Sequence, residues 1–387
     1  MIRVGFTIID GKVEWMGGIN YLKNLLFALS QLENKQIQPI LFVGNNTDEK
    51  LIKQFEDLAE IQRDSLFDRY SLKWFVYTFM RDILKRNFLI NQIIKKNRID
   101  IFSHSYIYGP DINCYTANWI PDFQHLRLPK LYSRLHLIVR DFRLKSLAKF
   151  SNKVILSSYD ALSDFKGFCP EFVSKASVIH FVSQVTSFEN KNFGYLEKKY
   201  KFTGKYFFLP NQFWAHKNHK VAFQAILLAK KQIPEIKLIC SGLLSDKRDN
   251  NHIQNLIKFI DENQLNANIM LLGLIPFSDV LIFMRHSLSI INPSYFEGWS
   301  STVEEAKSMK KDLILSNIPV HQEQVSISGD FFDPDKPEEL AAILIHKWHE
   351  TNSTIDQAYH KVDEQSLRTI EFANNYTSIV TDLLRSH

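Results

Sequence analysis

The chain has 387 residues and a mass of 45.3 kDa, a length that favours two domains. Aromatic residues make up 13% of the sequence, which excludes a mainly disordered chain, and no apolar stretch reaches the roughly 18 residues of a membrane-spanning helix. Residues 1–185 carry 25 basic and 18 acidic side chains, and the rest of the chain carries 22 and 24, so only the first half favours contact with an anionic surface.

The N-terminal segment and the cysteines indicate the cellular compartment in which the protein is expected. The N-terminal segment Met1–Asp10 lacks the basic region and long apolar core of a secretory signal. The three cysteines are far apart and form neither a disulfide framework nor a zinc-binding pattern. These features favour the reducing environment of the cytoplasm.

Short β-branched runs alternate with amphipathic stretches along the first half of the chain. Strands are expected at Arg3–Ile9, Pro39–Gly44, Asp100–His104, Cys114–Ile120, Lys153–Ser157 and Ser177–Phe181. Helices are expected at Gly18–Leu32, Leu72–Lys96, Pro129–Phe150 and Tyr159–Phe168. This alternation predicts a parallel sheet with crossover helices.

The second half repeats the alternation. Strands are expected at Tyr206–Pro210, Lys237–Ser241, Asn268–Leu272, Leu288–Asn292 and Asp312–Ser316. Helices are expected at Lys217–Lys231, Ile253–Asn263, Phe277–Arg285, Thr302–Met309 and Pro337–Trp348.

The polar segment Ser183–Gly204 separates the two halves and predicts a linker between domains at residues 1–183 and 184–366. The expected fold is α/β, with two doubly wound, Rossmann-like domains that face each other across a cleft. In such folds, ligands bind beyond the carboxyl ends of the strands.

The segment Asn292–Glu305 follows an expected strand and begins a helix. Its small residues allow a ligand to approach the backbone, and the amides of Ser300–Thr302 can bind a phosphate at the helix start. Glu305 can accept hydrogen bonds from ribose hydroxyls, and Glu297 can reach sugar hydroxyls. The alternative is that Ser301–Glu304 is only a capping box. We interpret Glu304, the last residue of that segment, in this way.

A second strand-to-helix segment, Phe208–His219, carries a cation at the expected helix start. Lys217 there can act as a point charge on a diphosphate. His216 and His219 have no evident third ligand, so we expect them to pack or to lie at the surface, and no metal site is predicted.

The first half offers two further candidate segments. Asp122 and His125 follow the strand that ends at Ile120, so either they face the cleft, or Asp122 caps the turn and His125 packs. Gly17 and Gly18 after the first strand form either an ordinary turn or a point of close approach to a ligand.

These segments together resemble retaining glycosyltransferase family 4, also called group 1, with the GT-B architecture. The resemblance extends over nearly the whole chain and is strongest in residues 205–335. It is carried by the Glu-x7-Glu motif of Glu297 and Glu305, the donor phosphate loop Asn211–His219, the segment Ser316–Glu323, and the glycine pair Gly17-Gly18.

The resemblance implies a role for each matching residue. Glu305 binds the ribose, Glu297 contacts the transferred sugar, and Lys217 binds the diphosphate. Asn211 stands where many members have an arginine, which weakens the positive clamp, and Ile275 lies in the segment whose backbone reads the base. The other donor-binding residues implied are Gly17, Gly18, Gly298, Trp299, Ser300, Ser301 and Thr302.

The family also has a histidine near the transferred sugar. Either Pro121 or His125 stands at that position, so the catalytic residues expected are Glu297, Lys217, His125 and Asp122. The resemblance implies that preorganised charge stabilises the leaving diphosphate and that no metal or cofactor is needed. It also implies that the C-terminal helix, about residues 367–387, packs on the first domain.

The activity implied is that of a cytoplasmic, retaining hexosyltransferase. It would move a hexose from GDP-mannose or a UDP-hexose to a glycan or a polyprenyl-diphosphate-linked glycan, in the biosynthesis of a surface polysaccharide such as O-antigen or capsule. The alternatives are a glycoside hydrolase that uses the two motif glutamates, a sugar-nucleotide epimerase, and a catalytically silent nucleotide-binding subunit.

The segment Arg127–Lys153 holds eight basic residues and one acidic residue among interleaved apolar ones. This pattern suits an anionic membrane surface, at the inner face of the cell membrane, or a lipid-diphosphate acceptor. It equally suits a helix that faces the core with a solvated basic side. No nucleic-acid-binding motif accompanies the charge, so nucleic acid is not an expected partner.

Overall fold

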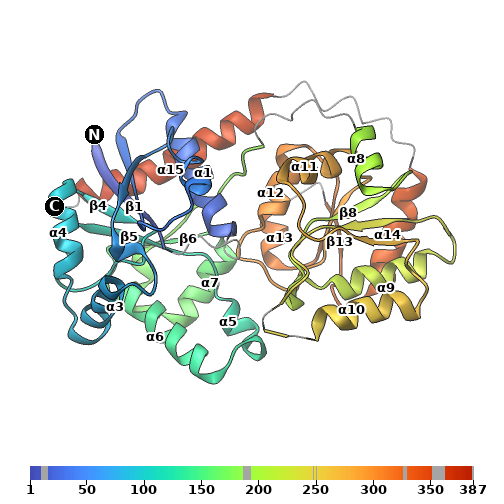
Figure 1. Ribbon diagram of the computed structural model, residues 1–387, viewed down its shortest axis with the longest axis horizontal. Coiled ribbons are helices and arrows are strands. Elements are labelled where there is room, and N and C mark those ends of the chain that lie inside the picture. The colour runs from blue at the N-terminus through green and yellow to red at the C-terminus, as the bar shows by residue number, and fades with distance from the viewer. Residues whose placement is uncertain are drawn as a thin grey trace. The chain divides into compact units, whose positions relative to one another are not determined.

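A computed structural model describes residues 1–9, 16–185, 193–246, 248–249, 251–325, 329–350 and 362–385. The chain forms two compact units (Figure 1). The N-terminal unit comprises Met1–Leu126, Ser133–Ser183 and Asp363–His387, and the C-terminal unit comprises Arg127–Tyr132 and Gln184–Val362.

The N-terminal unit is built on a seven-stranded sheet with the order β3-β2-β1-β4-β5-β6-β7, and every neighbouring pair is parallel. Its strands are β1 (Ile2–Ile8), β2 (Ile37–Val43), β3 (Glu60–Arg63), β4 (Ile101–Ser103), β5 (Tyr115–Ile120), β6 (Lys153–Leu156) and β7 (Ala176–Val178). The sequence pattern missed β3, since this edge strand has only one apolar residue.

Helices flank this sheet. They are α1 (Met16–Ser30), α2 (Glu49–Ile52), α3 (Leu72–Phe79), α4 (Phe88–Asn97), α5 (Gln124–Arg127), α6 (Arg134–Phe150), α7 (Tyr159–Phe168) and α15 (Val362–Arg385). The single helix expected over Leu72–Lys96 is wrong. A π-helical turn at Met80–Leu84 ends at Lys85, whose φ of 54° is left-handed, and Asp111 then holds the backbone amide of Asn87 at 3.0 Å.

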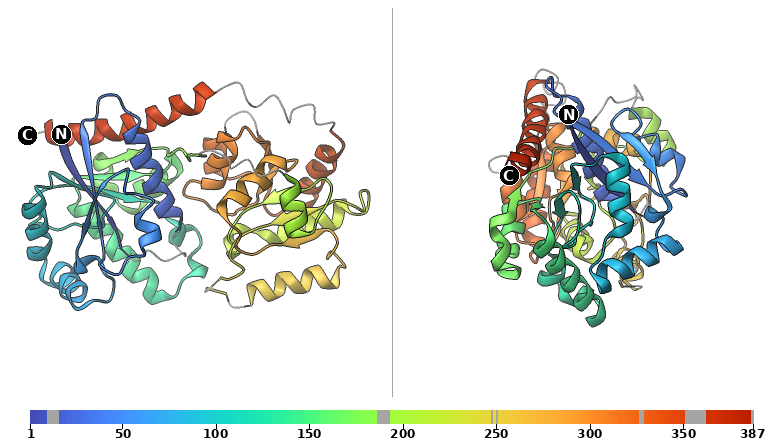
Figure 2. Two further views of the ribbon diagram at one scale, coloured as in Figure 1. Left: turned by 45° about the horizontal axis from the view of Figure 1, so that its top comes forward. Right: turned by 90° about the vertical axis from the view of Figure 1, so that its left-hand side faces the viewer.

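The C-terminal helix α15 packs on the N-terminal unit (Figures 1 and 2). The ring of Tyr376 lies 6.1 Å from that of Phe6 on β1 and 5.8 Å from that of His104, and Phe372 lies 6.1 Å from Tyr21 on α1. All of these side chains are buried, so the last helix completes the core of the first unit.

The C-terminal unit has a six-stranded parallel sheet with the order β10-β9-β8-β11-β12-β13. Its strands are β8 (Phe207–Leu209), β9 (Leu238–Cys240), β10 (Ile269–Leu271), β11 (Ile290–Asn292), β12 (Leu313–Ser316) and β13 (Gly329–Phe332). Its helices are α8 (Phe193–Tyr200), α9 (His219–Ala229), α10 (His252–Glu262), α11 (Phe277–His286), α12 (Ser301–Ser308), α13 (Pro319–Gln324) and α14 (Pro337–His349).

Both sheets reverse their strand order in the middle, so the prediction of two doubly wound α/β units is confirmed. The linker predicted over Ser183–Gly204 is wrong in part, because it contains α8; residues 186–192 lie outside the described structure. Leu196 of α8 is fully buried, and Lys199 pairs with the buried Asp279 of α11 at 2.6 Å. The polar composition of the segment concealed these tertiary contacts.

None of the helices in the described part of the chain is both long and apolar enough to cross a lipid bilayer.

Candidate functional site

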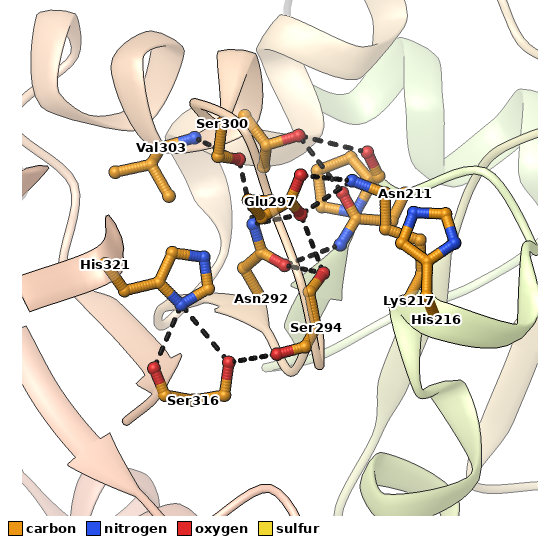
Figure 3. Close-up of polar contacts among 12 residues, drawn as sticks. Asn211, His216, Lys217, Asn292, Ser294, Glu297, Ser300, Val303, Ser316 and His321 are labelled. Carbon is orange, nitrogen blue, oxygen red and sulfur yellow. Dashed lines mark hydrogen bonds and ion pairs between the residues drawn. The ribbon is translucent and has the colours of Figure 1, made fainter. Parts of the chain in front are cut away.

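The loops after β8 and β11 meet because these strands are neighbours in the sheet. Lys217 ends a 3-10 turn after β8, and Glu297 lies in the loop between β11 and α12. Lys217 Nζ lies 2.6 Å from Glu297 Oε1 and 2.8 Å from Oε2 (Figure 3). Both side chains are largely withdrawn from solvent, with exposures of 13% and 8%. Two residues that the sequence placed at a donor site therefore form a single charged pair.

This pair sets the charge state of Glu297. Burial by itself would raise the pKa of the carboxyl group, but the Lys217 ammonium outweighs it and lowers the pKa to about 2. Ser294 Oγ also donates to Glu297 Oε1 at 2.7 Å. Glu297 is thus an ionised, oriented acceptor at neutral pH.

A buried amide network holds the two loops together (Figure 3). Asn211 Nδ2 donates to Asn292 Oδ1 at 3.0 Å, and Thr302 Oγ1 donates to Asn211 Oδ1 at 3.2 Å. Asn292 Nδ2 donates to Ser300 Oγ at 2.8 Å. The Asn211 side chain, expected to contact the donor, thus joins the β8 loop to the start of α12.

Ser300 is the N-cap of α12, and its Oγ accepts from Val303 N at 3.4 Å. The capping box expected over Ser301–Glu304 is therefore wrong, because the N-cap is Ser300 and its N3 residue, Val303, has no side-chain acceptor. Glu304 is fully buried and forms an ion pair with Lys307 at 3.1 Å.

The backbone amides of Ser301 and Thr302, which follow this cap, differ in hydrogen bonding from the amide of Ser300. Ser300 N is already bonded to Gln324 Oε1 at 3.0 Å. In the described part of the chain, no acceptor contacts the amides of Ser301 and Thr302. These two N–H groups at the positive end of the helix dipole can bind an anion.

Glu305 projects from the second turn of α12 and is 8% exposed. No hydrogen bond or ion pair from another described residue reaches its carboxyl group. Burial raises its pKa to about 8. A buried carboxyl group without a partner inside the protein is an unusual feature, and a ligand that supplies hydroxyl groups would satisfy it.

The remaining donor-side candidates lie around these groups. Gly298 and Trp299 are half-buried in the loop before α12, and Ile275 is half-buried between β10 and α11. Gly17 and Gly18 lie in the first turn of α1 in the N-terminal unit. A Cβ at Gly17 would meet no atom within 4 Å, so packing within the described structure does not require glycine there.

Two residues near this site were not predicted. His321 is fully buried on α13, and its Nδ1 lies 2.9 Å from Ser316 O, while Ser316 Oγ donates to Ser294 O at 2.6 Å (Figure 3). The segment Ser316–Glu323 was part of the family resemblance. The sequence did not indicate that its histidine contacts Ser316 and thereby supports the turn at Ser294, because these contacts are tertiary.

Arg248 is the second unpredicted residue, and it places a further cation beside the Lys217 loop. Its Nε donates to the buried Asp246 at 3.0 Å, and its Nη2 lies 3.3 Å from Nδ1 of His216. It is 31 residues after Lys217 in the sequence, in the loop after β9, and no motif marks it. Arg248 therefore places a guanidinium group, paired with Asp246, beside the loop that contains His216 and Lys217.

The histidines of the β8 loop are packing residues. His219 is fully buried and stacks on Phe213 with ring centroids 4.0 Å apart, and burial lowers the pKa of His216 to about 3. Across the described ranges, no group of three or more His, Cys, Asp or Glu side chains is arranged around a metal site.

In the N-terminal unit, Asp122 and His125 contact α6. Asp122 Oδ1 accepts from Gln124 N at 3.0 Å and pairs with Arg140 at 3.0 Å. His125 is buried, its Nδ1 accepts from Arg140 Nε at 3.1 Å, and its Nε2 lies 3.1 Å from Asp141 Oδ1. These contacts are those of the packing alternative, in which Asp122 caps the turn and His125 packs.

Comparison with known proteins gives the chain a family context. Residues 196–361 match the family model described as glycosyl transferases group 1. No curated protein matches the chain significantly.

The whole chain is similar in fold to several solved structures. HepE of Anabaena in complex with UDP and glucose matches with a TM-score of 0.73 and 14% identity, over 99% of this chain and 100% of that one. A glycosyltransferase from Rickettsia africae matches with a TM-score of 0.70 and 17% identity, over 100% and 99% of the two chains. Sucrose-phosphate synthase from Thermosynechococcus elongatus matches with a TM-score of 0.68 and 12% identity, over all of both chains. The GT-B architecture expected from the sequence is confirmed.

Proposed function

Because residues 196–361 match the family model of the group 1 glycosyl transferases, we propose that this chain transfers a hexose from a nucleotide sugar to a hydroxyl group of a glycan or lipid-linked glycan. The donor is a UDP-hexose or GDP-mannose, and the transfer retains the anomeric configuration, as in family 4. The product is part of a surface polysaccharide such as an O-antigen or capsule, and the enzyme acts in the cytoplasm at the inner face of the membrane.

One arrangement in the C-terminal unit carries this proposal. The Lys217–Glu297 pair, the Glu305 carboxyl group and the amides of Ser301 and Thr302 all lie beyond the carboxyl ends of β8 and β11. Among the described residues, none pairs with that carboxyl group or accepts a hydrogen bond from those amides. A nucleotide sugar has a matching group for each: a diphosphate for the cation and the amides, a ribose for Glu305, and sugar hydroxyls for Glu297.

In the proposed reaction, the bond from the anomeric carbon to the diphosphate breaks as the acceptor oxygen bonds to that carbon. The acceptor proton passes to the departing phosphate oxygen, so no side chain acts as a nucleophile. Lys217 and the amides of the α12 start stabilise the charge that develops on the diphosphate. No metal or other cofactor is required for these steps.

A hydrolase that uses Glu297 and Glu305 needs one carboxyl group that donates a proton and one that attacks the sugar. A hydrolase gives the Lys217 ammonium and the amides at the start of α12 no group to bind, whereas a nucleotide sugar supplies its diphosphate. This observation favours the transferase.

Thermal-shift titrations with UDP and GDP test the donor site. HepE was crystallised with UDP and glucose, which makes UDP the first nucleotide to use. A ligand at 100 times its dissociation constant stabilises the folded state by about 2.7 kcal/mol. We expect a shift with one nucleotide, loss of that shift in Glu305→Ala, and no loss in Glu338→Ala, which removes an exposed glutamate of the same unit.

The absence of a shift with both nucleotides in the folded protein would contradict the donor site. Incubation with the nucleotide sugar, with and without a glycan acceptor, then separates the activities. Transfer that requires the acceptor supports the proposal. Conversion of the donor alone indicates an epimerase, and binding without turnover indicates a silent subunit.

A further inference from the structure

Helix α6 carries an apolar stripe that faces solvent. Leu135, Ile138, Val139 and Phe142 follow the spacing i, i+3, i+4, i+7 of one helix face, yet their exposures range from 38% to 72%. Its buried apolar residues, such as Leu147, lie toward its C-terminal end. The first half of α6 therefore does not face the core, which had been one of the two alternatives for this basic segment.

A second stripe of the same kind lies on α3 and continues into the π-helical turn after it. Leu72, Phe75, Val76 and Phe79 have the same helical spacing and exposures of 43% to 80%. Three further exposed apolar side chains follow, at Ile83, Leu84 and Phe88. No sequence pattern singled out this stripe, because a buried helix has the same periodicity.

The two stripes belong to one surface of the N-terminal unit. Lys85, which ends the π-helical turn, has its Nζ 5.0 Å from the ring centroid of Phe142 on α6. Burial would raise the pKa of Asp82 in the turn, but Arg81 and, to a lesser extent, Arg143 on α6 lower it. Figures 1 and 2 show α3 and α6 side by side at one end of this unit.

We define the α3–α6 surface as the exposed apolar side chains of both stripes. They are Leu72, Phe75, Val76, Phe79, Ile83, Leu84, Phe88, Leu135, Ile138, Val139 and Phe142. Monomeric proteins seldom expose so many large apolar groups together, and such surfaces mark interaction sites.

The charge around the α3–α6 surface identifies the partner. Residues 69–88 and 134–149 together hold ten basic and two acidic side chains. One of the acids, Asp82, is paired with Arg81 at 2.8 Å. Six of the basic residues are exposed: Arg69, Arg86, Arg134, Arg143, Lys145 and Lys149. A second copy of the chain would bring the same positive charge against this surface, whereas an anionic bilayer complements it.

We propose that the α3–α6 surface docks on an anionic phospholipid bilayer. The apolar side chains of both helices enter the boundary between headgroups and acyl chains, and the flanking arginines and lysines contact the lipid phosphates. The surface lies entirely in the N-terminal unit, so the inference does not depend on the donor site. The sequence indicated membrane contact only for the basic and apolar residues of Arg127–Lys153, and the structure adds the exposed apolar stripe of α3.

Vesicle co-sedimentation tests this proposal with the full chain. The vesicles contain either phosphatidylcholine alone or 30% phosphatidylglycerol. We expect the wild type to bind the anionic vesicles, and we expect Phe75→Ser/Phe79→Ser and Leu135→Ser/Ile138→Ser each to lower the partition coefficient at least tenfold. The matched control, Leu367→Ser/Ile370→Ser on α15, removes two apolar side chains of 65% and 40% exposure and leaves binding unchanged.

The charge is tested separately. Each basic side chain near an anionic surface contributes about fivefold, so Arg134→Gln/Arg143→Gln lowers binding to anionic vesicles about 25-fold. Binding also weakens at high salt.

Three results would overturn the proposal. The first is no vesicle binding by the wild type, and the second is a loss in the α15 control equal to that in the stripe variants. The third is a wild-type dimer in light scattering that the stripe substitutions convert to a monomer, which would make this surface a self-association interface. We expect the nucleotide-induced thermal shift to be unchanged in every stripe variant. Loss of membrane binding can therefore be distinguished from loss of nucleotide binding at the donor site.

Discussion

Lys217 Nζ and the carboxylate of Glu297 form a bidentate contact at 2.6 and 2.8 Å across 80 residues of sequence. Both residues follow strands that pair in the sheet, so the topology brings them together. Lys217 has three N–H groups, which allows it to hold Glu297 and a diphosphate oxygen at the same time. Under the proposed function, the pair links the position of Glu297, which binds sugar hydroxyls, to that of Lys217, which binds the diphosphate.

Replacement of Lys217 by methionine removes the charge that compensates Glu297. Breaking a buried ion pair from one side costs about 3–5 kcal/mol, and we expect the free energy of unfolding to fall by that amount. Transfer activity should also be lost. Urea unfolding and a donor–acceptor assay measure the two effects.

The double variant Lys217→Met/Glu297→Leu separates stability from function. This variant leaves no charge at the position of the pair, so most of the lost stability should return. Activity should not return. A double variant that is as unstable as the single one would show that the pair matters through packing alone.

The pKa of Glu305 makes stability depend on pH in a defined direction. Burial raises the folded pKa to about 8 from an ordinary value of 4.5. The unfolded chain therefore releases this proton at lower pH than the folded protein, so stability falls as pH rises from 4.5 to 8 and levels off above it. One pKa unit corresponds to about 1.4 kcal/mol, so the total effect is a few kcal/mol.

Urea unfolding of wild type and Glu305→Gln at pH 5, 6, 7 and 8 measures this effect. We expect the variant to gain stability relative to the wild type as the pH rises. A constant difference across that range would mean that the Glu305 carboxyl group titrates normally.

Nucleotide binding gives the same residue a second signature. A ribose hydroxyl that donates to Glu305 favours the charged form and lowers its pKa, so UDP or GDP binding at pH 7 releases a proton. Calorimetry in two buffers with different ionisation enthalpies detects that proton. Glu305→Gln should bind without any release.

Gly242 controls the position of the β8 loop. Its φ is +145°, and a Cβ there would lie 2.2 Å from Asn211 O, which is backbone. We expect Gly242→Ala to destabilise the protein by at least 1–3 kcal/mol, because a strained φ and a backbone clash combine. In the same unit, an alanine Cβ at Gly194 of α8 would meet no atom within 4 Å. Gly194→Ala is the control, and it should leave the melting temperature unchanged or raise it.

Gly17 offers a test of close donor approach. A Cβ at this helical position meets nothing within 4 Å, so Gly17→Ala should keep the melting temperature or raise it slightly. If the donor phosphates lie against the backbone here, the KM for the nucleotide sugar rises while the fold is intact. An unchanged KM would assign Gly17 to an ordinary helix start.

The sequence predicted features that depend on local chemistry. Apolar runs marked most strands within two residues, since a buried parallel strand needs a continuous apolar segment. The Glu297 and Glu305 spacing, with the small residues between them, identified the loop before α12. The same reasoning missed β3, β13 and α8. The polar residues of β3 and α8 conceal their tertiary contacts.

The α/β class and the donor-side segments are thus evident from the amino-acid sequence, because each depends on consecutive residues. Which charges meet depends instead on the packing of distant segments. Lys217 pairs with Glu297 and Arg248 approaches His216, because the strand order places distant loops together, and no described residue pairs with the Glu305 carboxyl group. The same packing determines that the α3 and α6 stripes face solvent, since helical periodicity shows that a face is apolar but not what covers it.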